Sequence, residues 1–157
     1  MAYWLMKTEP SVFGIDDLKK KGRVPWDGVR NYAARNFLRD QMRPGDGVLV
    51  YHSSCPEPGV AGLGKVAAKG YPDALAFDPQ SKYFDPKSSP EAPRWFCVDI
   101  EFKKKAAKVV PLEFLRQTPE TRKMELLRLN RLSITPVRPG EWAFITGLAG
   151  FWKKGTA

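Results

Sequence analysis

The sequence is poor in the two residues from which disulfide frameworks and zinc sites are built. Its 157 residues include only two cysteines, Cys55 and Cys97, and a single histidine. Since small disulfide-stabilised proteins use far more cysteine, we expect two buried free thiols in a protein of the reducing cytoplasm. Zinc normally takes several Cys or His ligands, so we expect no metal site and no cofactor.

Long apolar runs are also missing. No stretch approaches the roughly 18 consecutive apolar residues that a membrane-spanning helix needs, which excludes a membrane protein. Hydrophobic residues nevertheless make up 43% of the chain and aromatics 12%. This composition is typical of a globular domain and too apolar for a disordered chain.

The common catalytic motifs are absent as well. His52 precedes two serines, but no GxSxG elbow surrounds either of them. Neighbouring residues of a strand point to opposite faces, which disfavours a catalytic pair of His52 and Ser53. The glycine-rich stretch 59–64 is no phosphate loop, because no Lys-Ser/Thr follows it. We therefore expect a protein that is not an enzyme, with His52 orienting structure or ligand at a strand end.

Positive charge is in excess, with 26 Lys and Arg against 17 Asp and Glu and a formal net charge of +9. Residues 1–93 carry 13 basic and 11 acidic side chains, whereas residues 94–157 carry 13 and 6. This asymmetry favours a face that binds nucleic acid over one that is merely solvated. The basic clusters are Lys103, Lys104, Lys105, Lys108, Arg122, Lys123, Arg128, Arg131 and Arg138.

Hydrophobic periodicity predicts an α+β fold. The expected strands are 3–6, 47–52, 59–69, 95–102 and 131–137, and the expected helices are 15–21, 31–43, 112–116, 119–130 and 139–148. Few of these elements follow a βαβ rhythm. We therefore expect a single domain built on a small barrel or curled sheet, with helices packed outside.

The segment 31–43 is the clearest of these helices. Asn31 suits its N-cap, and Pro44-Gly45 ends it. Two rows at helical spacing predict its core face, namely Ala33 with Phe37, and Ala34 with Leu38 and Met42.

Prolines and tryptophans mark the candidate binding region. Five prolines interrupt residues 70–94, which we expect to form a long functional or mobile loop. Trp26 lies in a Pro-Trp-Asp-Gly turn, and Trp95 follows the loop. Stacking of a base on an aromatic ring contributes about 1–3 kcal/mol. Two roles are equally favoured for Trp26, as the wall of a binding pocket or as the cap of a hydrophobic cluster. For Trp95 the role of a cap is favoured.

A series of motifs runs in one order along nearly the whole chain. It comprises Tyr3-Trp4-Leu5-Met6-Lys7-Thr8-Glu9-Pro10, Trp26-Asp27-Gly28-Val29-Arg30-Asn31-Tyr32, Ala34-Arg35-Asn36, Tyr51-His52-Ser53-Ser54, Pro58-Gly59-Val60-Ala61-Gly62, Tyr83-Phe84-Asp85, Trp95 and Arg131-Leu132-Ser133-Ile134-Thr135-Pro136-Val137. The series resembles an EVE domain over residues 1–157, with the Pro-rich loop at 70–94. Ala33 departs from the family pattern, which has a longer polar residue.

The resemblance implies a PUA-like fold, a curled β-barrel flanked by helices. EVE domains are similar to YTH domains, which hold a methylated adenine of RNA in an aromatic cage, and they are not known as enzymes. The resemblance implies a base pocket in which Trp26 is the stacking wall. We expect Tyr83 or Trp95 to form a second wall. The pocket residues we expect are Lys7, Thr8, Glu9, Trp26, Asp27, His52, Ser53, Tyr83 and Trp95. The phosphate contacts we expect are Arg30, Asn31, Arg35, Asn36 and Arg131.

These features predict a non-catalytic module that binds a modified base of DNA or RNA, flipped into an aromatic and polar pocket. The basic clusters after residue 93 would hold the backbone. One alternative is an enzyme on a modified nucleoside or nucleic acid, with His52 or Asp27 as acid–base group. Another is a domain that binds a small molecule or a protein. We expect a monomer without a membrane partner, cytoplasmic and with access to the nucleoid or nucleus.

Overall fold

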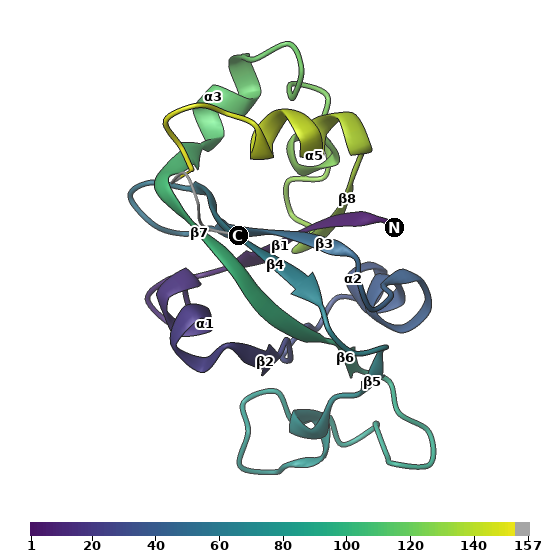
Figure 1. The fold of residues 1–157 in the computed structure, drawn as a ribbon. Coiled ribbons are helices and arrows are strands. Elements are labelled where there is room, and N and C mark those ends of the chain that lie inside the picture. Colours follow the sequence, from purple (N-terminus) through teal and green to yellow (C-terminus); the bar gives the residue numbers. More distant parts are fainter. Residues whose placement is uncertain (153–157) are drawn as a thin grey trace.

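A curled six-stranded sheet forms the centre of the molecule in the computed structural model, which describes residues 1–152 (Figure 1). Its strand order is β2-β7-β4-β3-β1-β8, in which β1 and β3 run parallel and the other pairs antiparallel. The strands are β1 (Tyr3–Thr8), β2 (Arg23–Pro25), β3 (Gly47–His52), β4 (Gly59–Val66), β7 (Asp99–Pro111) and β8 (Ile134–Val137). This architecture confirms the predicted curled sheet flanked by helices.

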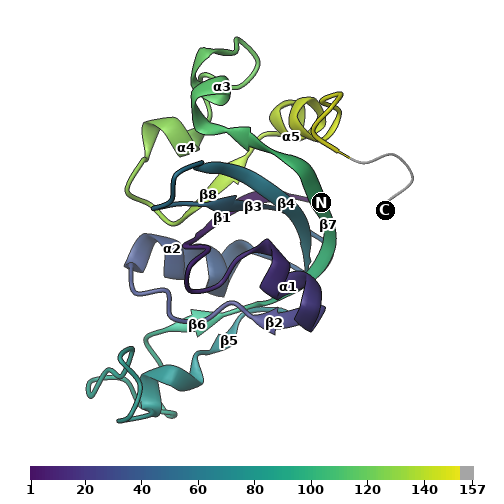
Figure 2. The ribbon, with the colours of Figure 1, turned by 90° about the vertical axis from the view of Figure 1, so that its left-hand side faces the viewer.

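Helices cover both faces of the sheet (Figure 2). The helices α1 (Ile15–Lys21) and α2 (Tyr32–Asn36) lie within its concave side, and α2 continues into a π-helical turn η1 (Phe37–Gln41). The opposite side carries α3 (Leu112–Gln117), α4 (Glu125–Arg128) and α5 (Pro139–Thr146). A two-stranded hairpin of β5 (Tyr71–Pro72) and β6 (Phe96–Cys97) holds the ends of the Pro-rich loop, which also contains the 3₁₀ turn η2 (Ala74–Phe77).

The alternation of side chains along the strands divides the core into two layers. In β1, Trp4 and Met6 pack into the concave cluster, whereas Leu5 belongs to the cluster under α3–α5. The strand β3 repeats the pattern, with Val48 and Val50 on the concave side. Since successive strand residues point to opposite faces, a stretch buried on both sides is apolar, as residues 4–6 of β1 and 48–50 of β3 are.

Bulges bend the sheet into its curled shape. The register between β4 and β7 shifts between Val60 and Gly62 and again between Leu63 and Gly64, and such shifts increase local bending and twist. At Gly62 a Cβ atom would lie 2.3 Å from Ile15 Cδ1 and 2.6 Å from the Lys104 carbonyl oxygen. The glycine therefore lets α1 pack directly on the sheet.

Two predicted helices are shorter than expected. The segment 31–43 forms α2 and then η1, and of its predicted core face Ala34, Leu38 and Met42 are buried but Ala33 is exposed. So short a helix contacts the sheet along one stripe only. Of the predicted helix 119–130, only α4 is helical. The fully buried Thr121 hydroxyl instead donates to the Leu115 carbonyl at 2.7 Å, a side-chain bond that competes with the helix.

The predicted strand 95–102 is divided and longer than expected. It forms β6 and the 13-residue β7, so Lys103–Lys105 lie inside a strand. The two cysteines also differ. Cys97 is buried, which raises the pKa of its thiol to about 12, whereas Cys55 is partly exposed and the prediction of a buried thiol there is wrong. Among residues 1–152 no helix is long and apolar enough to cross a bilayer.

Candidate nucleic-acid interface

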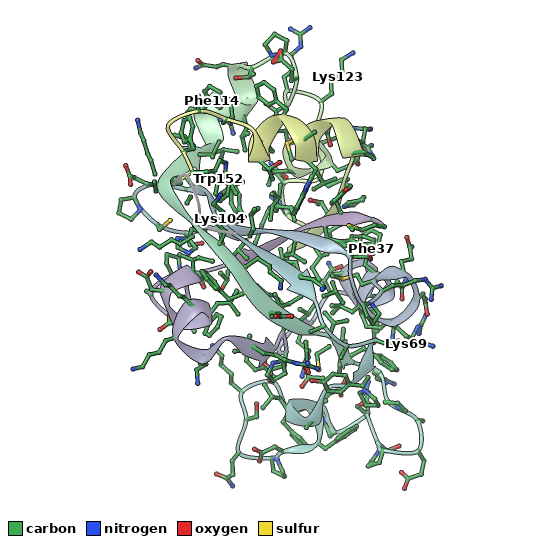
Figure 3. All side chains as sticks on the ribbon, in the orientation of Figure 1. Phe37, Lys69, Lys104, Phe114, Lys123 and Trp152 are labelled. Atoms are coloured by element: carbon green, nitrogen blue, oxygen red, sulfur yellow. The ribbon has the colours of Figure 1, made fainter. Side chains whose placement is uncertain are left out.

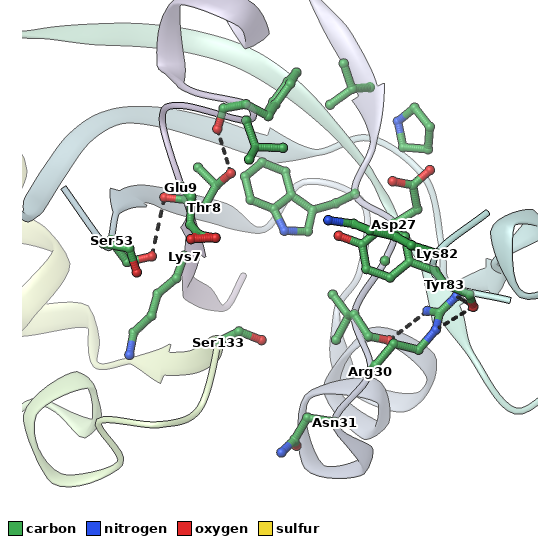
Figure 4. A pocket seen from close by; sticks show the side chains of 18 of the residues that line it. Lys7, Thr8, Glu9, Asp27, Arg30, Asn31, Ser53, Lys82, Tyr83 and Ser133 are labelled. Atoms are coloured by element: carbon green, nitrogen blue, oxygen red, sulfur yellow. Dashed lines mark hydrogen bonds between the residues drawn. The ribbon is translucent and has the colours of Figure 1, made fainter. Parts of the chain in front are cut away.

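A cavity of about 1000 Å³ opens where the carboxyl end of β1 faces the segment between β2 and α2 (Figure 4). The loop residues Lys82 and Tyr83 and the turn before β8 complete its wall. Most of the predicted pocket lies here, together with three of the predicted phosphate contacts: Lys7, Thr8, Glu9, Trp26, Asp27, Ser53, Tyr83, Arg30, Asn31 and Arg131. The fold thus brings together segments that are far apart in the sequence.

The β1 end supplies a wall rich in hydrogen-bond acceptors. The Thr8 hydroxyl donates to the Phe13 carbonyl at 2.6 Å, and the Ser53 hydroxyl donates to the Thr8 carbonyl at 3.5 Å (Figure 4). The same carbonyl accepts the Ser53 backbone N–H at 2.9 Å. The Thr8 proton is thereby used within the chain, which leaves its oxygen as an acceptor beside the Glu9 carboxylate. The Lys7 ammonium donates to the Asn130 carbonyl at 2.9 Å, and burial lowers its pKa.

The opposite wall is the turn that follows β2. Trp26 is only 8% exposed, and its backbone N–H donates to the Val98 carbonyl at 2.8 Å. Asp27 is exposed at the cavity, but the surrounding protein and the nearby Asp73 carboxylate raise its pKa. Gly28 adopts φ +79°, and a Cβ atom there would lie 2.9 Å from the Tyr83 ring. Glycine is therefore needed both for the backbone conformation and for the approach of Tyr83.

Behind this wall lies a group of satisfied polar residues, Arg30, Asp73, Asp85 and Trp95, which we call the anchor cluster. The Asp73 carboxylate, fully buried, accepts from the Gly28 N–H at 2.8 Å and from Arg30 Nη1 at 3.0 Å. The Arg30 guanidinium also donates twice to the Tyr83 carbonyl, at 2.9 and 3.1 Å (Figure 4), and once to the Val29 carbonyl. These bonds occupy four of its five N–H groups. Arg30, predicted to contact phosphate, thus ties the Pro-rich loop to the cavity wall.

Four predicted site residues lie outside the cavity lining. His52 Nε2 accepts the Ile15 N–H at 3.1 Å, which fixes the start of α1, and burial lowers its pKa. Trp95 belongs to the anchor cluster, since its indole N–H donates to Asp85 at 2.7 Å and its ring stacks on Tyr32 at 4.7 Å. Arg35 donates to the Arg94 carbonyl and to Asn36 Oδ1, so both side chains are engaged within the chain.

The predicted basic clusters do not gather at the cavity. Arg131 alone among them lines it. Several of the others form ion pairs, as in Lys105–Asp16 and Arg138–Glu141, while Lys104 lies beside Trp152 and Lys123 at the α3–α4 end (Figure 3). The cations at the cavity instead come from separate segments. Those that form no ion pair within residues 1–152 are Lys7, Lys21, Lys82 and Arg131.

Sequence reasoning missed several residues of the lining. Lys21, Lys82, Asn130 and Ser133 all face the cavity. Ser133 belongs to the motif 131–137 that resembles the family, and Lys82 directly precedes the motif 83–85, so both positions could have been found from these motifs. Lys21 ends a helix and Asn130 lies in a turn, and charged and polar residues are common at such exposed places without any function.

The fold and the cavity together define a small β-rich domain with a polar and aromatic pocket ringed by cations. The family model "EVE domain" matches residues 2–148, and the chain belongs to this family. Human thymocyte nuclear protein 1 is 39% identical over 166 residues, covering 94% of this chain and 73% of the relative.

Several solved structures are similar over nearly the whole chain. A hypothetical protein from Leishmania major has a TM-score of 0.90 at 49% identity, with 93% of this chain and 92% of that chain covered. Human THYN1 protein, in complex with DNA that contains 5-methylcytosine, has a TM-score of 0.86 at 38% identity, with 92% and 95% covered.

Proposed function

We propose that this EVE domain is a DNA-binding module that takes one modified base, flipped out of its strand, into the cavity. The observation that carries the proposal is the fold match to human THYN1 protein, whose structure is a complex with 5-methylcytosine containing DNA. The cavity of about 1000 Å³ falls within the size range of small-molecule sites, about 300–1,000 Å³. A nucleobase with its sugar is a ligand of the size that such sites hold.

The chemistry of the walls supports the same proposal. Glu9 and Asp27 present carboxylates, and the Thr8 oxygen is a further acceptor. Carboxylates accept hydrogen bonds from the exocyclic amino group of cytosine. The cations Lys21, Lys82 and Arg131 at the cavity are placed for the phosphates on either side of a flipped base. A role on DNA would require access to the nucleoid or nucleus.

The experiment is a binding series on matched oligonucleotides by fluorescence anisotropy. One central position carries cytosine, 5-methylcytosine or thymine, in DNA and in RNA of the same sequence. We expect the 5-methylcytosine DNA to bind most tightly, and all affinities to fall steeply between about 50 and 200 mM salt. Equal affinities for the plain and the modified strands would contradict the proposal, and tighter binding of the RNA would reassign the nucleic acid.

The same series separates the alternative functions. A small-molecule or protein-binding domain would bind the oligonucleotides weakly and without regard to modification. The enzyme hypothesis makes His52 or Asp27 the acid–base group. His52 lies outside the cavity lining and its Nε2 accepts the Ile15 N–H, so Asp27 is the candidate that faces the cavity. Incubation of the modified DNA with the protein, followed by nucleoside mass spectrometry, tests for turnover. The predicted monomer is checked by light scattering on the same samples.

A further inference from the structure

The ring of Trp26 is enclosed by the concave core. The residue is 8% exposed and packs with the buried cluster that includes Val24 and Val98. Phe13 meets it edge-on, with ring centroids 6.1 Å apart and planes at 90°. A base that stacks needs an open aromatic face, and so small an exposed fraction leaves no face of Trp26 free.

The indole N–H of Trp26 is nevertheless without a partner. Trp4, Trp95 and Trp152 donate theirs to Asp46, Asp85 and the Ile145 carbonyl. Within residues 1–152, the Nε1 atoms of Trp26 and Trp142 make no hydrogen bond, and of these two residues only Trp26 lines the cavity. In that same part of the chain, Thr135 Oγ1 is the one buried side-chain nitrogen or oxygen that lacks a partner. Trp26 Nε1 is therefore reached by solvent, and the opening is the cavity that Trp26 lines.

A second aromatic ring borders the cavity on the same wall as Trp26. Tyr83 is partly exposed, and its ring packs against Gly28 with the Arg30 guanidinium 5.4 Å from the ring centroid. The Lys82 ammonium lies 5.0 Å from the same centroid, and Lys82 is an exposed side chain that can move to a phosphate. The anchor cluster holds the backbone of Tyr83 while its ring borders the cavity.

We propose that Trp26 recognises the bound base by donating its indole N–H to an acceptor atom on the base edge, while Tyr83 supplies the stacking face. The inference rests on the proposed function, a flipped base in this cavity. The edge of cytosine offers an amino donor beside two acceptors, N3 and O2. The walls offer carboxylate acceptors on Glu9 and Asp27 beside the Trp26 donor, which is the complementary pattern. Thymine carries an N–H at position 3, so a donor would face a donor there.

The test follows the indole N–H signals of ¹⁵N-labelled protein during titration with an oligonucleotide that carries one 5-methylcytosine. We expect the Trp26 proton signal to move downfield on binding, whereas the Trp95 signal, already bonded to Asp85, stays in place. Trp26→Phe keeps an aromatic ring in the core and removes the donor. We expect this variant to bind about tenfold more weakly, equivalent to about 1.4 kcal/mol, with an unchanged spectrum elsewhere.

The outcomes separate the inference from the function on which it rests. If the protein binds the modified DNA but the Trp26 signal stays in place, or if Trp26→Phe binds as tightly as the parent, the inference is wrong and the function stands. If no signal moves and anisotropy detects no binding, the function and the inference both fall. Should Trp26→Phe not fold, the wild-type titration decides alone, because sequential assignment identifies the Trp26 signal.

Discussion

The cavity wall and the anchor cluster behind it use the same residue types in opposite ways. Each contains a tryptophan and an aspartate. In the anchor cluster Trp95 donates to Asp85, and Asp73 is bonded to Arg30. At the cavity wall Trp26 Nε1 has no acceptor within residues 1–152, and in that range Asp27 forms no ion pair. Polar groups satisfied within the chain hold the fold, whereas unsatisfied groups that face a cavity are free for a ligand.

The largest effect is expected from breaking the anchor cluster at Asp73. Asp73→Ala leaves the Arg30 guanidinium and the Gly28 and Leu75 N–H groups without their shared acceptor. Removing one partner of a buried charge pair costs about 3–5 kcal/mol, and we expect about 3 kcal/mol less stability in urea unfolding. Asp78→Ala is the matched control, because within residues 1–152 this loop carboxylate accepts only the exposed Gln80 N–H. Equal stability of the two variants would contradict a structural role for the cluster.

The second prediction compares two tyrosines, one at the cavity wall and one beside the anchor cluster. Tyr83 lines the cavity, whereas Tyr32 stacks on Trp95 and is 51% exposed. A stacked base contributes about 1–3 kcal/mol, so Tyr83→Ala should weaken binding of 5-methylcytosine DNA by tenfold or more. Tyr32→Ala should leave the preference for the modified base intact. Anisotropy titrations measure both, and an equal loss of preference would show that Tyr83 has no special place in recognition.

How much of the fold and of the cavity could be predicted from the sequence depends on how far apart in the chain the contacting residues lie. The strands β1 and β3 followed from apolar runs and turn signals, which are local, whereas the cavity residues at their ends followed from the resemblance of their motifs to an EVE domain. The role of Arg30 did not, because its partners Asp73 and Tyr83 lie 43 and 53 residues away. The orientation of Trp26 likewise depends on Phe13 and Val98, which belong to other elements. The sequence can place a turn tryptophan at a site, but it cannot predict which part of the indole ring faces the cavity.

The third prediction concerns charge at and away from the cavity. Arg131 lines the cavity, whereas Lys123 lies at the α3–α4 end. If Arg131 contacts a phosphate, Arg131→Gln should weaken binding a few-fold and reduce the slope of log affinity against log salt by about 0.9. Lys123→Gln removes the same charge from the protein and should leave the slope unchanged. Equal slopes for both variants would mean that net charge, and not the position of Arg131, governs binding.

The smallest effect distinguishes the two regions by the sign of their pH dependence. Burial and Asp73 raise the pKa of Asp27 above its ordinary value of 3.8, whereas the Trp95 N–H lowers that of Asp85. Folded Asp27 therefore holds its proton to a higher pH than unfolded Asp27, so its contribution to stability falls as pH rises above about 3.8. Asp85 contributes stability that is present above this pH and is lost as pH falls below it.

Asp27→Asn should thus stabilise the protein at neutral pH, by less than about 0.5 kcal/mol because water screens this exposed carboxylate. The gain should disappear as the pH falls toward 3.8. Asp85→Asn should do the reverse, with a loss at neutral pH that vanishes in acid. Urea unfolding of both variants and the parent between about pH 3 and 7 measures the difference, since stability follows the protons bound by each state. A loss of stability in Asp27→Asn at neutral pH would place Asp27 with the anchor residues, because only a carboxylate that stabilises the fold in its charged form gives that sign.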